Sequence, residues 1–445
     1  MKNKNIYKFL LAATMLLGVV NLNAQEGTTP PEEPQKTESE VFREDIDNNA
    51  LEIKKLKKLK ISGYFQAQLE VSDQFGATKV GGTTAYQHGK DPASGVFTRF
   101  GIRRGRVKIA WEESFGSAVF QLDITEKGVG IKDAYLKVSE PWLKVFSLTA
   151  GLFDRPFGDE ISYSSSRRES PERSIVFQNL FPDERDLGVM LTVAAPKGSV
   201  VEGLKLDAGL FSGNGIRLDD NSKMDFIGHL KYDKKWSNIA FGVGVSTYLG
   251  STNNADSDSM FYRVKDGDWA LQEDKKLNTL HARQYYGIDA QFSITSSWGI
   301  TNIRGEYLWG TQPSKKGSFG SPKADTYAGT APFNYIRNFS GGHLYFIQDI
   351  YKTPLTFVFK YGYLNPNTKL KTNEIKEKTD LANHNYGLGL LVRITSYLRL
   401  QLFYELIVNE KTDRINPAMQ ANNKELDYSK NVKDNVFTAR LQFKF

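Results

Sequence analysis

The last nine residues of the chain alternate strictly between apolar and polar side chains. The apolar positions are Phe437, Ala439, Leu441, Phe443 and Phe445, and the polar ones are Thr438, Arg440, Gln442 and Lys444. Because successive side chains of a β-strand point to opposite sides, such a segment has one apolar and one polar face. A strand that ends a chain on an aromatic residue is typical of a membrane β-barrel, although a soluble sheet shows the same alternation.

The amino terminus has the pattern of a secretion signal. Lys2, Lys4 and Lys8 precede the apolar stretch 9–20, and Ala24 followed by Gln25 is a suitable cleavage point. An apolar stretch of about 12 residues is too short for a helix to cross a membrane. We therefore expect a signal peptide at 1–24 and, after its removal, a location in the cell outer membrane of a Gram-negative organism.

From residue 61 onward the chain reads as strand after strand. The predicted strands are 60–72, 97–111, 116–126, 131–139, 143–153, 186–195, 203–212, 224–233, 237–249, 282–294, 298–310, 339–350, 354–364, 384–395, 397–408 and 434–445. The connections between them are alternately short and long, as in outer-membrane barrels with tight periplasmic turns and long external loops. The sequence thus predicts an all-β fold, a transmembrane antiparallel β-barrel of about 16 strands over residues 61–445.

The segment 25–60 precedes the barrel. Residues 25–39 are rich in Pro, Glu, Thr and Gln, which is typical of a disordered linker, whereas 40–60 has helical spacing of its apolar residues. Five lysines between Lys54 and Lys60 fit a solvated helix face. They also fit a short periplasmic coiled coil that helps the protein to oligomerise, or a contact with anionic lipid head groups.

Parity along the strands predicts which charges line the lumen. The basic lumen-facing positions are Arg106, Lys108, Arg304, Arg393, Arg399 and Arg440. Parity alone places Arg103 outward, where a charge costs about 2–4 kcal/mol at mid-depth, so Arg103 should lie near the rim or at a bulge. Among all the lumen-facing positions that parity gives, Arg and Lys outnumber Asp and Glu, and a lumen with this excess favours anions. The alternative is that these charges pair across the wall and only hold its shape.

The longest charged connection, about 154–185, carries dense charge of both signs. Pro156 and Gly158 suggest a defined turn. In a barrel this wide, such a loop would fold inward and constrict the pore. An ordinary external loop with salt-bridged charges is the alternative.

Enzyme chemistry is not expected. The chain has no Cys, its five His are scattered without metal-ligand spacing, and no Gly-x-Ser-x-Gly sequence occurs. We expect no cofactor and no metal. A net charge of +7, of which the signal contributes three lysines, does not indicate nucleic acid as a partner.

Three segments together resemble the phosphate-selective porin O/P family. They are Gly101-Ile-Arg-Arg-Gly-Arg-Val-Lys-Ile109, Ile131-Lys-Asp-Ala-Tyr-Leu136, and Gly151-x-Phe-x-x-Pro-Phe-Gly-x-Glu160 with Glu172-Arg173 and Arg185-Asp-Leu-Gly188 after it. The resemblance implies a 16-stranded homotrimeric porin with a basic constriction for phosphate-like anions. On matching positions, the constriction residues would be Arg103, Arg104, Asp133, Arg173, and Arg167 or its neighbour Arg168.

These observations favour a passive channel for small anions such as phosphate or polyphosphate, embedded in outer-membrane lipid. A general or sugar-admitting diffusion porin is the first alternative. The second is a barrel-anchored surface binding protein whose long loops do the work.

Overall fold

The computed structural model describes residues 38–73, 77, 79–80, 96–217, 219, 221–253, 260–273, 280–321, 334–416, 418–419 and 425–445. The predicted signal peptide and the linker up to residue 37 lie outside these residues. The described part begins with the helix α2, Glu38–Leu56, as the prediction of a short N-terminal helix required. Within the described ranges, no helix is long and apolar enough to cross a membrane.

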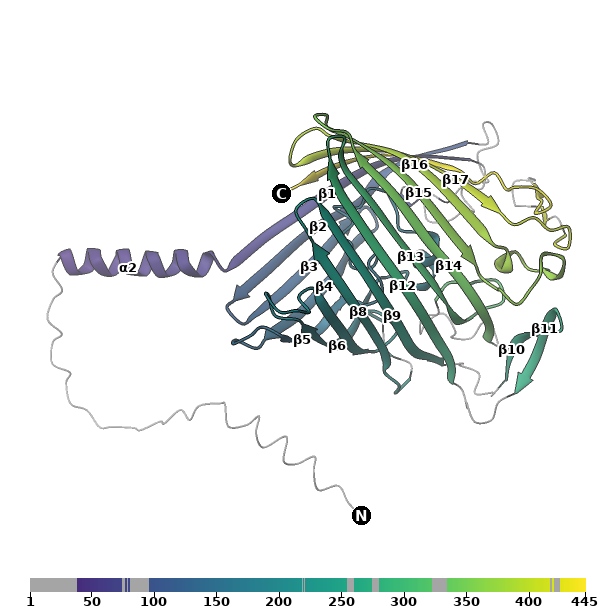
Figure 1. Cartoon of the computed structure of the whole chain (residues 1–445), viewed down its shortest axis with the longest axis horizontal. Coiled ribbons are helices and arrows are strands. Elements are labelled where there is room, and N and C mark those ends of the chain that lie inside the picture. The colour runs from purple at the N-terminus through teal and green to yellow at the C-terminus, as the bar shows by residue number, and fades with distance from the viewer. Residues whose placement is uncertain are drawn as a thin grey trace, which may run out of the picture. The chain divides into compact units, whose positions relative to one another are not determined.

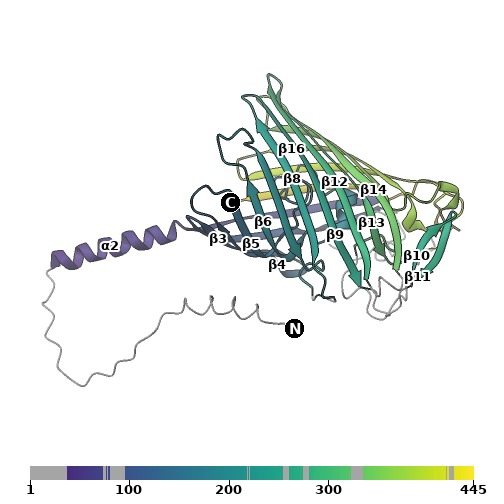
Figure 2. The same cartoon turned by 60° about the horizontal axis from the view of Figure 1, so that its bottom comes forward.

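Sixteen antiparallel strands form a closed barrel (Figures 1 and 2). They are β1 (Leu59–Asp73), β2 (Val96–Glu113), β3 (Gly116–Thr125), β4 (Gly128–Ser139), β5 (Phe146–Asp154), β6 (Arg185–Ala194), β7 (Leu204–Phe211), β8 (Asp225–Lys235), β9 (Ile239–Asn253), β12 (Leu280–Ser296), β13 (Gly299–Ser314), β14 (Asn334–Asp349), β15 (Leu355–Asn365), β16 (Asn383–Arg393), β17 (Leu398–Asn409) and β20 (Val436–Lys444). Each predicted strand corresponds to one of these, so the predicted fold class is confirmed.

The first and last strands close the barrel. β1 pairs with β20 in antiparallel register, with Tyr64 opposite Lys444 and Ser72 opposite Val436. Gly63 and the terminal Phe445 exchange two backbone hydrogen bonds of 3.0 Å. A Cβ at Gly63 would lie 2.6 Å from the ring of Phe445, so this position has no room for a larger residue. The aromatic terminus is therefore part of the barrel seam.

The two faces of the wall differ as parity predicted. On β20, Leu441 and Phe443 are exposed on the outside, whereas Arg440 and Gln442 are buried inside. The same alternation recurs around the barrel, for example with Tyr404 outside and Gln401 inside on β17. An apolar exterior around a polar interior is the pattern of an outer-membrane barrel, because lipid contacts only every second residue.

Connections are mostly short at one end of the barrel and long at the other. The long connection between β9 and β12 contains a hairpin that parity did not predict, formed by β10 (Met260–Lys265) and β11 (Asp268–Glu273). Three residues of β10 pair in parallel with β14, which extends the sheet beyond the barrel wall (Figure 1). The remaining short elements are α4 (Ile175–Leu180), η3 (Thr372–Glu374), η4 (Lys378–Asp380), β18 (Ala418–Met419) and β19 (Glu425–Leu426).

Candidate functional site

The connection between β5 and β6, residues 155–184, lies inside the barrel; we call it the lumen loop. Ser165 hydrogen-bonds with Tyr64 of β1, with 2.5 Å between the hydroxyl oxygens. Ser170 hydrogen-bonds with Tyr345 of β14 at 2.7 Å. Because β1 and β14 belong to distant parts of the wall, the loop spans the lumen between them.

One side of the lumen loop is apolar and packs against the wall. Phe157, Phe177 and Phe181 of the loop are each 1 % exposed or less. They join a cluster with lumen-facing side chains of seven strands. Those partners are Phe211, Ile227, Tyr248, Tyr285, Leu308, Phe339 and Leu364. Each buried Phe contributes roughly 1.5–3 kcal/mol, so this packing holds the loop against β7–β9 and β12–β15.

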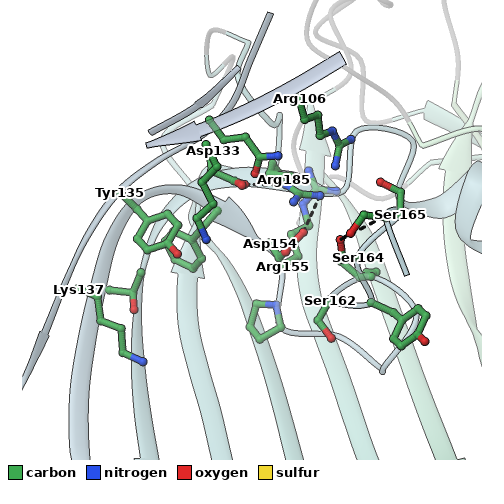
Figure 3. A pocket seen from close by; sticks show the side chains of 18 of the residues that line it. Arg106, Asp133, Tyr135, Lys137, Asp154, Arg155, Ser162, Ser164, Ser165 and Arg185 are labelled. Atoms are coloured by element: carbon green, nitrogen blue, oxygen red, sulfur yellow. Dashed lines mark hydrogen bonds and ion pairs between the residues drawn. The ribbon is translucent and has the colours of Figure 1, made fainter. Parts of the chain in front are cut away.

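The opposite side of the loop borders a cavity of about 460 Å³ against β1–β7 (Figure 3). The loop presents the hydroxyls of Ser162, Ser164, Ser165 and Ser166 to it. Among the charged lining residues, eight are basic and three are acidic. The basic ones are Arg106, Lys108, Lys137, Arg155, Arg173, Arg185, Lys205 and Lys444, and the acidic ones are Asp133, Asp154 and Asp207.

All four of these arginines form ion pairs with carboxylates, but only one of the four lysines, Lys205, does so among the described residues. Lys108, Lys137 and Lys444 lie on β2, β4 and β20 at lumen-facing positions near the short-turn end. None of the three ammonium groups forms an ion pair with any residue in the described part of the chain. Their charge is therefore available to a solute in the cavity.

Arg103 and Arg104 both point inward, which a regular strand does not allow for neighbours. The register between β1 and β2 shifts there: Gln66 lies opposite Arg104, but Ala67 lies opposite Ile102. Arg103 is thus the extra residue of a β-bulge, which re-aims its side chain into the lumen. This is one of the two positions that the sequence reasoning allowed for Arg103.

Three guanidinium groups converge on one carboxylate of the lumen loop. Arg103 donates to Glu172 at 2.7 and 2.8 Å, Arg104 at 3.2 Å and Arg440 at 3.0 Å. Burial alone would raise the pKa of Glu172, but the charges of Arg103 and Arg104 outweigh it and hold this pKa well below the usual range. The cluster keeps a net positive charge after the pairing.

A second β-bulge lies in β4, directly before Asp133. Gln121 lies opposite Asp133 while Leu122 lies opposite Ile131, so Lys132 is the extra residue of β4 and forms an ion pair with Glu184 at 3.0 Å. Asp133 accepts a hydrogen bond of 2.9 Å from Nε of Arg185. Arg185 also contacts Asp154 at 2.7 Å, and Figure 3 shows it between the two carboxylates. Asp133 is thus neutralised by a residue that the sequence analysis quoted but did not propose for the site.

The predicted loop arginines lie in different surroundings. Arg173 forms an ion pair with Glu184 and donates to the carbonyls of Glu160 and Ile161 at 2.9 Å. Arg167 is exposed, with its guanidinium 5.2 Å from the ring centre of Tyr163. Its neighbour Arg168 is 2 % exposed. None of the three guanidinium nitrogens of Arg168 has a hydrogen-bond partner within the described ranges.

The other predicted lumen residues are mostly held by partners. Arg106 pairs with Asp123 at 3.2 Å, and Arg304 pairs with Glu169 at 2.5 Å. Arg399 donates to the carbonyl of Arg167 and to Gln442. Arg393 pairs with Asp349 at 3.0 Å.

The structure therefore brings only part of the predicted set to the cavity. Arg106, Lys108, Asp133 and Arg173 line it, whereas Arg103, Arg104 and Arg440 surround Glu172. The remaining predicted residues, Arg167, Arg304, Arg393 and Arg399, lie outside its lining.

Sequence reasoning missed three groups of functional interest. Lys137 stood at lumen parity and could have been found from it, and Lys444 was placed on the polar face of its strand but not proposed for the site. Lys132 could not, because the bulge that turns it inward leaves no trace in the alternation.

Known proteins resemble this chain in fold and not in sequence. No family model matches it, and neither does any curated protein sequence. The structure of Pseudomonas putida OprB is similar with a TM-score of 0.50 and 10 % identity, over 89 % of this chain and 96 % of that one. The outer membrane channel DcaP of Acinetobacter baumannii gives 0.49 and 11 %, over 87 % and 97 %.

At such identities the likeness to OprB supports the fold alone. The closed 16-strand barrel, with its apolar exterior and charged lumen, indicates a protein that lies in the outer membrane. The chain is an outer-membrane β-barrel with the architecture of a porin-like channel.

Proposed function

We propose that this protein is a porin through which small anions, phosphate-like ones above all, diffuse passively across the outer membrane. The observation that carries the proposal is the set of three cavity lysines that have no ion-pair partner among the described residues, Lys108, Lys137 and Lys444. In the proposed channel the lumen loop forms the constriction, and solutes pass between it and the wall formed by β1–β7.

The energetics fit transport better than tight binding. A unit anion 4 Å from an ammonium group gains about 1 kcal/mol in bulk water and about 4 kcal/mol at an effective dielectric constant of 20. Several such sites in sequence concentrate anions while still releasing them, as conduction requires. Serine hydroxyls from the loop add neutral donors on the facing side.

We assign two roles to the predicted constriction residues. Arg103 and Arg104, together with Arg440, hold Glu172 and give the loop a positive background. Arg173 and Asp133 border the cavity itself, where Arg173 attracts an oxyanion and Asp133 accepts a hydrogen bond from a protonated phosphate. The homotrimer that the family resemblance implies is part of the same proposal.

Reversal potentials across a planar bilayer in a KCl gradient test the proposal. We expect a strong preference for chloride over potassium and a decrease of the chloride current when phosphate is added. A cation preference would contradict anion transport, whereas anion preference without block would contradict a phosphate-type site.

A second candidate is a sugar-admitting pore. Three tyrosines, Tyr64, Tyr135 and Tyr163, line the same cavity, and aromatic rings pack well against the apolar faces of sugars. Liposome swelling separates the two functions, because a sugar pore admits neutral sugars at rates that do not depend on the lysines.

A further inference from the structure

The helix α2 leaves a row of large apolar side chains uncovered. Phe42, Ile46, Ile53 and Leu56 are between 51 and 66 % exposed; we call them the α2 stripe. A helix of 19 residues is about 28 Å long, and most of the stability of helices in proteins comes from packing of their apolar face. The stripe therefore requires a partner surface.

The spacing of the stripe is that of a coiled coil. With Ile46 and Ile53 at heptad position a, Phe42 and Leu56 fall at position d. An a/d stripe is a narrow seam, whereas a helix that lies on a membrane has a broader apolar face. Asn49 occupies the remaining d position, where a single polar residue fixes register at a cost in stability.

The flanking charges and the chain topology indicate parallel helices. Asp45 and Glu52 both occupy position g, so an antiparallel pair would place these acidic positions against each other. Glu52 also contacts Lys55 of its own helix at 2.8 Å. Two residues separate Leu56, the last residue of α2, from the start of β1. In copies inserted in one membrane with the same topology, the C-terminal ends of the helices are therefore joined to equivalent points of their barrels.

We infer that α2 is an assembly element: copies of this chain pack their helices in parallel through the α2 stripe. This inference goes beyond the proposed channel function, since it concerns how the copies are held together and not what passes through them. Each chain supplies one barrel and one α2 helix, so the bundle contains as many helices as the assembly contains barrels.

Engineered cysteines test the packing directly, because the natural chain has no Cys. We expect the full-length variants Ile46→Cys and Ile53→Cys, folded in detergent and oxidised, to form disulfide-linked dimers. The matched control Asn48→Cys, on the same helix at position c and exposed, should give at least tenfold less. Equal cross-linking at stripe and control positions, or none at the stripe, would overturn the inference.

A second variant covers the case in which a cysteine alone weakens the helix. Ile46→Glu combined with Ile53→Glu should lower the temperature at which the assembly dissociates on a gel, while single-channel conductance stays unchanged. Protection of the Ile53→Cys thiol by lipid vesicles, without cross-linking, would assign the stripe to the membrane surface and overturn the inference. None of these measurements depends on anion selectivity. They can therefore contradict the packing of α2 between copies without contradicting anion transport, and the reverse also holds.

Discussion

Arg103 donates two hydrogen bonds to Glu172, from Nε to Oε1 at 2.7 Å and from an Nη nitrogen to Oε2 at 2.8 Å. The contact joins the bulge of β2 to the lumen loop, 69 positions later in the chain. Two more arginines share the same carboxylate, so its loss affects both the loop and the lumen charge.

Replacing this carboxylate should have two measurable effects. In Glu172→Gln the three guanidinium groups lose their counter-charge, which costs on the order of 3 kcal/mol of stability for a buried pair. The same change makes the lumen more positive, so the anion-to-cation permeability ratio should rise. Heat-dependent mobility on gels and reversal potentials measure the two effects.

The control for that variant is Glu113→Gln. Glu113 pairs with Lys58 at 2.8 Å, and both side chains are more than a third exposed. Solvent screens an exposed pair, which therefore contributes little to stability, so this change should alter neither quantity. Equal effects of the two substitutions would contradict the role given to Glu172.

Because Arg103 is the extra residue of the bulge in β2, we expect the barrel to tolerate its deletion. Removing one residue from a membrane strand normally moves every following side chain to the other face. Deletion of Arg103, however, places Ile102 and Arg104 in direct succession opposite Ala67 and Gln66, which restores regular alternation. This deletion should therefore fold and insert into membranes, whereas deletion of Val107 should not. Heat-modifiable migration distinguishes the two, and failure of both would show that the bulge does not absorb the change.

Acid should loosen the lumen loop through Glu160. Its carboxylate accepts from Ser174 and from Tyr345 of β14. Burial opposes its charged form, but the charges of His343, Lys360 and Arg168 and the Ser174 hydrogen bond lower the pKa of Glu160 from 4.5 to about 2. A carboxyl group whose pKa is lower in the folded than in the unfolded protein stabilises the fold at pH values above its unfolded pKa. This contribution is lost as the pH falls from the unfolded pKa to the folded pKa.

The loop should thus stay anchored above about pH 4.5 and lose on the order of 3 kcal/mol between that pH and pH 2. Single-channel recordings at decreasing pH should show increasing current fluctuation in this window. Glu160→Gln should show it already at neutral pH, and Glu202→Gln on a short turn should behave as the natural protein does. Stable currents of Glu160→Gln at pH 7 would contradict this anchor.

The sequence was sufficient for the barrel because lipid imposes period-two alternation on every strand. The strand predicted at 97–111 is found at Val96–Glu113, and that at 298–310 at Gly299–Ser314. The hairpin of β10 and β11 was missed because it lies outside the membrane-type wall, where no such alternation is imposed.

The site was harder to predict for two physical reasons. Bulges at Arg103 and Lys132 change parity locally without any sequence signal. The apolar lumen residues, such as Leu308 and Phe339, contradict a purely polar lumen and are explained only by the loop that covers them. Likewise, burial and not residue type distinguishes Arg168 from its exposed neighbour Arg167.

The most direct test of the account is the reversal potential of a variant in which Lys108, Lys137 and Lys444 are all changed to Gln. The natural protein should prefer anions strongly, and the triple variant should lose most of that preference while keeping its barrel. Lys197→Gln, on the exposed turn between β6 and β7, is the matched control and should retain the preference. An anion preference that survives in the triple variant would contradict the central claim that these unpaired lysines select the solute.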